Sequence, residues 1–270
     1  MTGLSAESGK VLANAGRALI RVPPRPLTDH HLSIDLPDAL PRSGGLSRDR
    51  AEDLLQAYRR VREILAATAE CDACTACLAY RWRPAGDGVG EPDYDSDHPQ
   101  WHVFGRSRTG DQPPIPSLSQ PRRARRAARP GCFALGESPA VPPEETDPAG
   151  CACCVPSVET DQELWRHAGV RVIRPQRPVV PRSLLVLPLR HVASPGSLTP
   201  DELVSIWDRL AECVDHLEVT GASVFVNDGR RAAQHIPHVH LHVFGRSVDE
   251  PENPFVSLAR ATARNRPADR

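Results

Sequence analysis

Apolar and polar residues alternate most regularly near the end of the chain. From His238 to Val243 each histidine is followed by a valine or a leucine. A strict two-residue period is typical of a half-buried strand, whose successive side chains point to opposite faces. We therefore expect Val239, Leu241 and Val243 to enter a core. The three histidines between them would share the other face.

Two further stretches have the helical period instead. Thr199, Pro200 and Glu202 form a capping box with proline at the first helical position, which predicts a helix start. Ser47 opens a similar stretch earlier in the chain. Buried stripes are expected on both helices, and they comprise Leu54, Leu55, Tyr58, Val61 and Leu65 in the first, and Leu203, Ile206, Leu210, Val214 and Leu217 in the second.

The chain repeats this order of elements. The predicted strands at 16–21 and 32–37 have counterparts at 170–174 and 184–188, each pair preceding one of the helices. The repeat ends on the same six residues, His-Val-Phe-Gly-Arg-Ser, beginning at His102 and again at His242. Within this segment, however, Gln100 occupies the position that corresponds to His240.

The repeat predicts four segments. Residues 12–108 form a degenerate half, 109–150 a disordered linker rich in Pro and Arg, 151–255 an active domain, and 256–270 a flexible tail. The arginine run in the linker is expected to be solvated, as most such runs are.

Overall charge and hydropathy narrow the range of partners. The formal net charge of the 270 residues is −1, so nucleic acid is an unlikely partner. No long apolar run and no amino-terminal signal pattern is present, which favours a soluble cytoplasmic protein that does not bind membranes.

Six of the eight cysteines lie in two clusters, and their close spacing suits metal binding or free thiols better than disulfides. Cys71, Cys74 and Cys77, with His98, are a candidate metal site. The second cluster contains Cys151, Cys153 and Cys154.

Three histidines on one strand face have several possible roles, because imidazole can be a donor, an acceptor, a nucleophile or a ligand near neutral pH. A solvated polar face is one interpretation. A catalytic zinc held by three histidines is another, since such sites take three protein ligands and a water.

The segment from Asn227 through Gln234 to the three histidines resembles the histidine-triad (HIT) superfamily, and most of all its fragile-histidine-triad branch of nucleotide hydrolases. The strand at 184–190 and Pro178 to Pro181 upstream add to the likeness, which covers about residues 165–250. The tandem arrangement is similar to that of galactose-1-phosphate uridylyltransferases.

This resemblance implies an α+β protein of two fused HIT-like folds. Each would be an antiparallel sheet with helices, and the two would pair within one chain as an intramolecular pseudo-dimer. The protein would then be a monomer, and only the second half would be active, because the amide of Gln100 cannot act as a nucleophile.

The resemblance also implies a role for each site residue. His240 would attack phosphorus, oriented by the backbone carbonyl of His238, and His242 would contact phosphate oxygens. Gln234 would donate to the bridging or attacking oxygen. Asn227 would contact phosphate, and backbone N–H groups around Ala233 and His235 would add electrostatic stabilisation.

Relatives that carry zinc imply a structural site here as well. Its ligands would be Cys151, Cys154, His191 and His238, a closed set of two cysteines and two histidines.

Five residues depart from the family pattern. Glycine is usual at Ala233, Ser or Thr at His235, a Gly-His pair at Arg182 and Ser183, and a ribose-contacting Asn at Pro175. The bulkier and more basic surroundings favour an unusual substrate or weak activity.

The function that follows is a nucleotide hydrolase or nucleotidyltransferase that cuts at the α-phosphate through a covalent nucleotidyl-histidine. Dinucleoside polyphosphates and nucleoside phosphoramidates are example substrates. One alternative is transfer of a nucleotidyl group to a sugar phosphate or another phosphate acceptor. A non-catalytic nucleotide sensor is an alternative of a different class.

Overall fold

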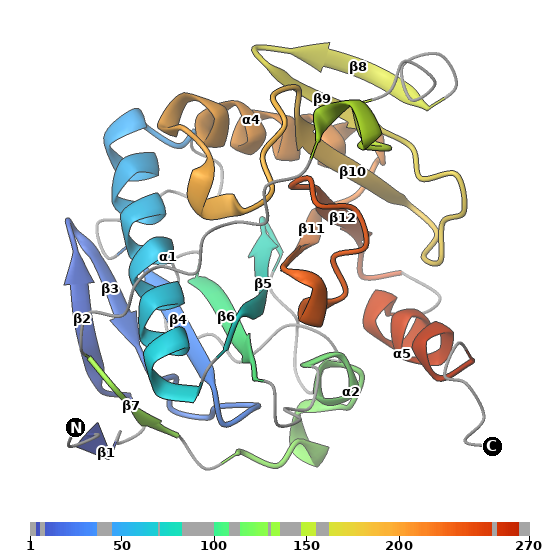
Figure 1. Ribbon diagram of the computed structural model, residues 1–270. Helices are drawn as coiled ribbons and strands as arrows, with labels where there is room; N and C mark the ends of the chain where they lie inside the picture. Colours follow the sequence, from blue (N-terminus) through green and yellow to red (C-terminus); the bar gives the residue numbers. More distant parts are fainter. Residues whose placement is uncertain are drawn as a thin grey trace.

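The computed structural model describes residues 4–5, 9–36, 45–69, 71–82, 100–107, 114–128, 131–135, 147–154, 162–249 and 253–264. Most of these residues belong to one antiparallel sheet and the helices that cover it (Figure 1). Along the sheet, its ten strands are β2 (Val11–Ala15), β3 (Ala18–Arg21), β4 (His31–Asp35), β6 (Gln100–Arg106), β5 (Ala73–Tyr80), β11 (Gly221–Asp228), β12 (Leu241–Arg246), β10 (Ser183–Pro188), β9 (Val170–Ile173) and β8 (Glu163–His167).

The strand order is the same in both halves of the chain. From the outer edge inwards, the first half runs β2-β3-β4-β6-β5 and the second runs β8-β9-β10-β12-β11. The two sets meet where β5 pairs with β11, in a register that places Tyr80 opposite Ala222 and Cys74 opposite Asp228. The antiparallel β5–β11 pair therefore joins two five-stranded sets into one sheet.

Two long helices cover one face of this sheet. Helix α1 (Arg48–Ala69) packs on β2, β3 and β4, and α4 (Pro200–His216) packs on β9, β10 and β12 (Figure 1). The capping box at Thr199 is present, with both of its reciprocal hydrogen bonds. The predicted apolar stripes face the main core, and only Leu217 is partly exposed.

A second apolar cluster fills the opposite face. Helix α5 (Pro254–Arg264) inserts Phe255 there, and α2 (Pro114–Leu118) inserts Leu118, beside Phe104 and Phe244 of the sheet. Helix α5 occupies a stretch for which the sequence predicts a flexible tail from residue 256. The difference arises because Phe255, just before that boundary, is fully buried and anchors the helix.

Described parts of the predicted linker also form secondary structure. Besides α2, they include the short strand β7 (Cys132–Phe133), which pairs with β1 (Leu4–Ser5), and 3₁₀ turns at Arg122–Ala124 and Pro148–Gly150. Leu118 and Phe133 are buried and supply the apolar contacts that order these segments.

Histidine positions follow the predicted alternation, although β12 itself begins only at Leu241. Val239, Leu241 and Val243 belong to the main core, as expected. Within the ranges given above, no helix combines the length and the apolar character needed to cross a membrane.

Candidate active site and metal centre

The centre of the site is the imidazole of His240. Its Nδ1 lies 2.7 Å from the backbone carbonyl oxygen of His238. Because a carbonyl only accepts hydrogen bonds, Nδ1 carries the proton and donates it. In the neutral ring the lone pair then belongs to Nε2, so this nitrogen is available as a nucleophile.

Burial keeps the histidines of this face neutral. Desolvation lowers the pKa of His240, although its bond to the His238 carbonyl opposes the shift, and the nearby His235 lowers it further. Burial, with a smaller contribution from His240, lowers the pKa of His242 to about 3. The rings of His240 and His242 meet edge to face with centroids 5.1 Å apart. Both rings are therefore uncharged near neutral pH.

His238 faces a different group of side chains. Its Nε2 donates to the carbonyl of Pro188 at 2.9 Å, which leaves Nδ1 as a lone-pair donor. That Nδ1 lies 3.5 Å from Sγ of Cys151 and 3.4 Å from Sγ of Cys154. Nδ1 of His191 lies 3.4 Å from the same Cys154 sulfur. The four residues expected from the resemblance thus converge.

The geometry of this group fits a tetrahedral metal. The four ligand atoms lie within 4.8 Å of one another. A zinc ion with Zn–S near 2.3 Å and Zn–N near 2.05 Å would place sulfur and nitrogen roughly 3.5 Å apart. The observed sulfur–nitrogen distances of 3.4 and 3.5 Å match that separation.

Two of the four side chains are thiols from a single turn. Cys151 and Cys154 lie at either end of the turn that follows Pro148–Gly150, and this turn packs on β9 and β10. Burial and the adjacent Cys151 raise the pKa of Cys154 to about 11. A bound divalent cation would instead favour both thiolates. Cys153 is a buried apolar contact in the same turn.

Gln234 connects several backbone groups at this end of the strand. Its Oε1 accepts the Gly229 N–H at 2.7 Å, and its Nε2 donates to the Ala193 carbonyl at 2.8 Å. Nε2 also lies 3.5 Å from the His238 carbonyl that receives the His240 proton. The side chain expected to donate to a phosphate oxygen is therefore engaged by the backbone around the nucleophile.

The remaining predicted residues surround the same strand end. Asn227 is the penultimate residue of β11, and Ala233 and His235 are exposed in the loop that leads to His238. Ala233 has a φ of 65° and Arg182 a φ of 54°, both in the left-handed region. These are two of the positions where the family pattern has glycine, and the backbone conformation explains that preference.

The first half carries a different arrangement at the corresponding place. Gln100 is buried at the start of β6, and His102 is fully buried with Nδ1 3.0 Å from Nε2 of His31. The N–H of Leu27 donates to Nδ1 of His31. The ring of His31 also stacks on Phe104. His31 lies one residue before the strand predicted at 32–37 and belongs to no motif, so it was not expected at a site.

The other cysteine cluster does not assemble a site within the described residues. Cys74 lies in the main core beside Tyr58, whereas Cys77 points to the opposite face, as strand residues three apart must. The expected fourth partner, His98, lies outside the described residues. Among residues with a described position, Cys151, Cys154, His191 and His238 are the one group that could hold a metal.

Comparison with known proteins agrees with the geometry of the second half. Residues 158–249 match the model of the HIT domain family. The match includes all three histidines and Gln234, and it begins after Cys151 and Cys154. It leaves out the first half, where Gln100 lies.

Curated relatives match a stretch of similar length. The bis(5'-adenosyl)-triphosphatase of Dictyostelium discoideum is 33% identical over 81 residues, covering 28% of this chain and 54% of that protein. The asymmetrical bis(5'-nucleosyl)-tetraphosphatase of Schizosaccharomyces pombe is 32% identical over 85 residues, covering 30% and 47%. The chain thus spans about half the length of these curated relatives.

Among solved structures, the Caenorhabditis elegans NitFhit protein is 28% identical, with a TM-score of 0.31 and coverage of 38% of this chain and 26% of that one. A HIT family hydrolase from Clostridium thermocellum is 22% identical, with a TM-score of 0.34 and coverage of 38% and 96%.

Proposed function

We propose that this chain is a nucleotide hydrolase or nucleotidyltransferase that acts at an α-phosphate through a covalent nucleotidyl-His240. One observation carries the proposal. The Nδ1 proton of His240 is held by the His238 carbonyl at 2.7 Å, which leaves the Nε2 lone pair free for attack. The HIT family match over residues 158–249 and its phosphohydrolase relatives support the same chemistry.

The reaction would proceed in two displacements. In the first, Nε2 of His240 attacks the α-phosphorus and the bond to the bridging oxygen breaks, so the leaving phosphate takes the electron pair. In the second, water attacks the same phosphorus, the phosphorus–nitrogen bond breaks, and the proton of the water passes to solvent. If a phosphate acceptor attacked the same intermediate in place of water, the reaction would be nucleotidyl transfer instead of hydrolysis.

Neighbouring residues would stabilise the transferring phosphoryl group. His242, which is neutral, would donate to a phosphate oxygen, and Asn227 would do the same from the end of β11. The backbone N–H of His235 would add a donor without charge, whereas that of Ala233 already donates to the Arg230 carbonyl at 2.9 Å. Donation from Gln234 to a bridging or attacking oxygen stays a prediction, because its amide is engaged by the backbone here.

We also propose that Cys151, Cys154, His191 and His238 hold a structural zinc ion. Such an ion would fix the 151–154 turn to the start of the active strand through His238. The first half would be a second, inactive HIT-like fold, so that the chain is an internal pseudo-dimer. The equal strand order of the two halves supports this view.

The decisive experiment is to trap the intermediate. Diadenosine triphosphate labelled at the α-phosphate is mixed with protein and quenched, and the labelled peptide is identified by mass spectrometry. A phosphoramidate is stable in base and labile in acid. We expect one adduct per chain, on His240. A label near His102, or turnover without any trapped label, would contradict the proposal.

A further inference from the structure

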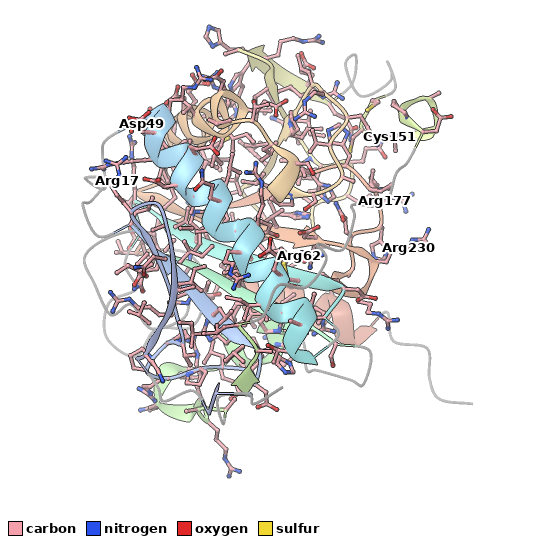
Figure 2. The ribbon with its side chains drawn as sticks, turned by 60° about the vertical axis from the view of Figure 1, so that its left-hand side comes forward. Arg17, Asp49, Arg62, Cys151, Arg177 and Arg230 are labelled. Atoms are coloured by element: carbon pink, nitrogen blue, oxygen red, sulfur yellow. The ribbon has the colours of Figure 1, made fainter. Side chains whose placement is uncertain are left out.

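A buried polar cluster lies where the two halves meet, close to the proposed phosphate site. Asp228, the last residue of β11, accepts a hydrogen bond from the Tyr58 hydroxyl at 2.8 Å and another from the Ser194 hydroxyl at 3.0 Å. Nε of Arg62 lies 3.3 Å from the same oxygen. Tyr58 and Arg62 belong to α1 of the first half, and Figure 2 labels Arg62 on that helix.

The side chains of Arg62 and Asp228 are both largely buried. The Asp228 side chain is 5% exposed and that of Arg62 is 15% exposed. Burial, followed by the charge of Asp228, raises the pKa of Tyr58 well above its usual value, so the phenol stays protonated and donates. An isolated carboxylate would be unfavourable at this depth, so the first half provides the groups that make Asp228 acceptable there.

Asp228 is connected to the active-site loop through its chain neighbour. The N–H of Gly229 donates to Oε1 of Gln234 at 2.7 Å, and Nε2 of Gln234 donates to the carbonyl of Ala193. Ala193 precedes Ser194, which itself bonds to Asp228. Asp228, Gly229, Gln234, Ala193 and Ser194 thus form a closed ring of contacts.

This ring reaches the nucleophile. Nε2 of Gln234 lies 3.5 Å from the His238 carbonyl, and Nδ1 of His240 donates to that carbonyl. A displacement of Asp228 would move Gly229 and Gln234, and with them the group that orients His240. Arg62 also donates to the Asp72 carbonyl, and the Asp72 side chain pairs with Arg231 in the same loop.

A second contact from the first half reaches Asn227, the residue proposed to contact phosphate. The hydroxyl of Thr75, a buried residue of β5, lies 3.2 Å from Oδ1 of Asn227 and donates to it. With its carbonyl oxygen engaged, the Asn227 amide is left with its N–H groups for other partners. Those are the groups that would bind a phosphate oxygen.

We propose that Tyr58, Arg62 and Thr75 are positioning residues for the site of the other half. They hold Asn227 and Asp228 so that Gln234 and His240 keep their orientation. The inactive half would therefore contribute to turnover without touching the substrate. This inference rests on the proposed function, yet the contacts themselves can be tested without it.

The test uses single hydroxyl deletions in the full chain. Tyr58→Phe keeps the buried ring, and Thr75→Val keeps the shape of the side chain. Tyr80→Phe is the matched control, because Tyr80 lies in the same half and packs on Trp207 away from the site. Thr75→Ser restores the donor and serves as the rescue variant.

Two readouts are measured for each variant. Hydrogen exchange at the Gly229 amide, followed by NMR, reports the loop contact directly, with the Ala222 amide of β11 as the internal reference. Turnover of diadenosine triphosphate reports the chemistry. Removing a partner that orients a reactive group typically lowers activity about 10- to 100-fold, and we expect a loss of that size in kcat with little change in KM.

Selective effects would support the proposal. Exchange at Gly229 should accelerate in Tyr58→Phe while exchange at Ala222 stays as in the wild type. Thr75→Val should lose kcat and Thr75→Ser should recover it, and Tyr80→Phe should resemble the wild type in both readouts.

Other outcomes would overturn the inference. One is an unchanged Gly229 exchange rate and kcat in both deletions, and another is an equal loss in Tyr80→Phe, which would indicate general destabilisation. If the wild type shows no turnover, the proposed function fails, but the exchange readout still decides whether Tyr58 holds the loop.

Discussion

At the scale of single residues, the tautomer of His240 determines what the site can do. Because Nδ1 donates to the His238 carbonyl, Nε2 is the ring nitrogen whose lone pair could act as a nucleophile. Burial lowers the pKa of His240, so this lone pair is not lost to protonation near neutral pH. A nucleophile of this kind has no equivalent at Gln100.

His240→Asn should therefore lower kcat by at least about a thousandfold, the scale observed when a covalent nucleophile is removed. Substrate affinity should change much less, since His242 and Asn227 remain in place. Steady-state kinetics measure the change, and His216→Asn, an exposed histidine of α4, is the control. Near-normal turnover in His240→Asn, combined with complete inhibition by chelators, would favour a catalytic metal held by the three histidines.

Backbone conformation gives a second prediction at this scale. Ala233 has a φ of 65°, and a left-handed conformation disfavours alanine by about 1–2 kcal/mol. Glycine would remove this strain but would lose about 0.5–1 kcal/mol through the greater freedom of the unfolded chain. We expect Ala233→Gly to raise the free energy of unfolding by up to roughly 1 kcal/mol, measured by urea denaturation.

The matched control is the reverse substitution at Gly229, whose φ is 92°. A Cβ there would lie 2.9 Å from Cβ of Ala73, so Gly229→Ala should destabilise the protein. If Ala233→Gly destabilises it as well, left-handed strain at Ala233 is not the dominant effect.

At the scale of elements, the 151–154 turn and the segment that leads into β12 meet at the cysteine–histidine group. If this group holds zinc, purified protein should contain about one equivalent of the metal, since the four ligand atoms define one site. Because a thiol must lose its proton to bind the metal, acid should release the metal and lower the melting temperature of the protein. A chelator should have the same effect by removing the metal.

The measurements are elemental analysis and thermal unfolding with and without a chelator. A double substitution, Cys151→Ser with Cys154→Ser, should abolish the metal content. Cys213→Ser is the control, because Cys213 is a buried cysteine of α4 outside the group. Full metal content in the double variant would exclude this site.

Local sequence patterns predicted some elements well. The capping box at Thr199 and the alternation ending at Val243 depend on neighbours a few residues apart, and the structure has both. Helix α5 was missed because one aromatic residue, Phe255, anchors it against a cluster assembled from distant strands. Tyr58 was expected only as a core residue, since its contact with Asp228 joins positions 170 residues apart.

The site residues were likewise predicted only in part. The resemblance brought together Cys151, Cys154, His191 and His238, and the structure gathers all four. It did not indicate that Gln234 would be held by the carbonyl of Ala193 and the N–H of Gly229, because backbone partners leave no mark in the sequence.

At the scale of the whole molecule, the antiparallel pair of β5 and β11 joins the two halves. We expect the protein to be active as a monomer, since the edges that two separate chains would use to pair are already joined. Light scattering combined with activity at decreasing protein concentration provides the measurement. An obligate dimer that loses activity on dilution would show that a partner chain is required.

The connection between the halves also has a consequence for how each half can evolve. In a symmetric dimer each substitution appears twice, so no subunit can change its role without its twin. In this chain the Tyr58–Asp228 contact occurs once, with one partner in each half. Substitutions can therefore accumulate in the first half without an equal change in the second. A duplicated gene that became one reading frame would be able to acquire such a division of labour from then on.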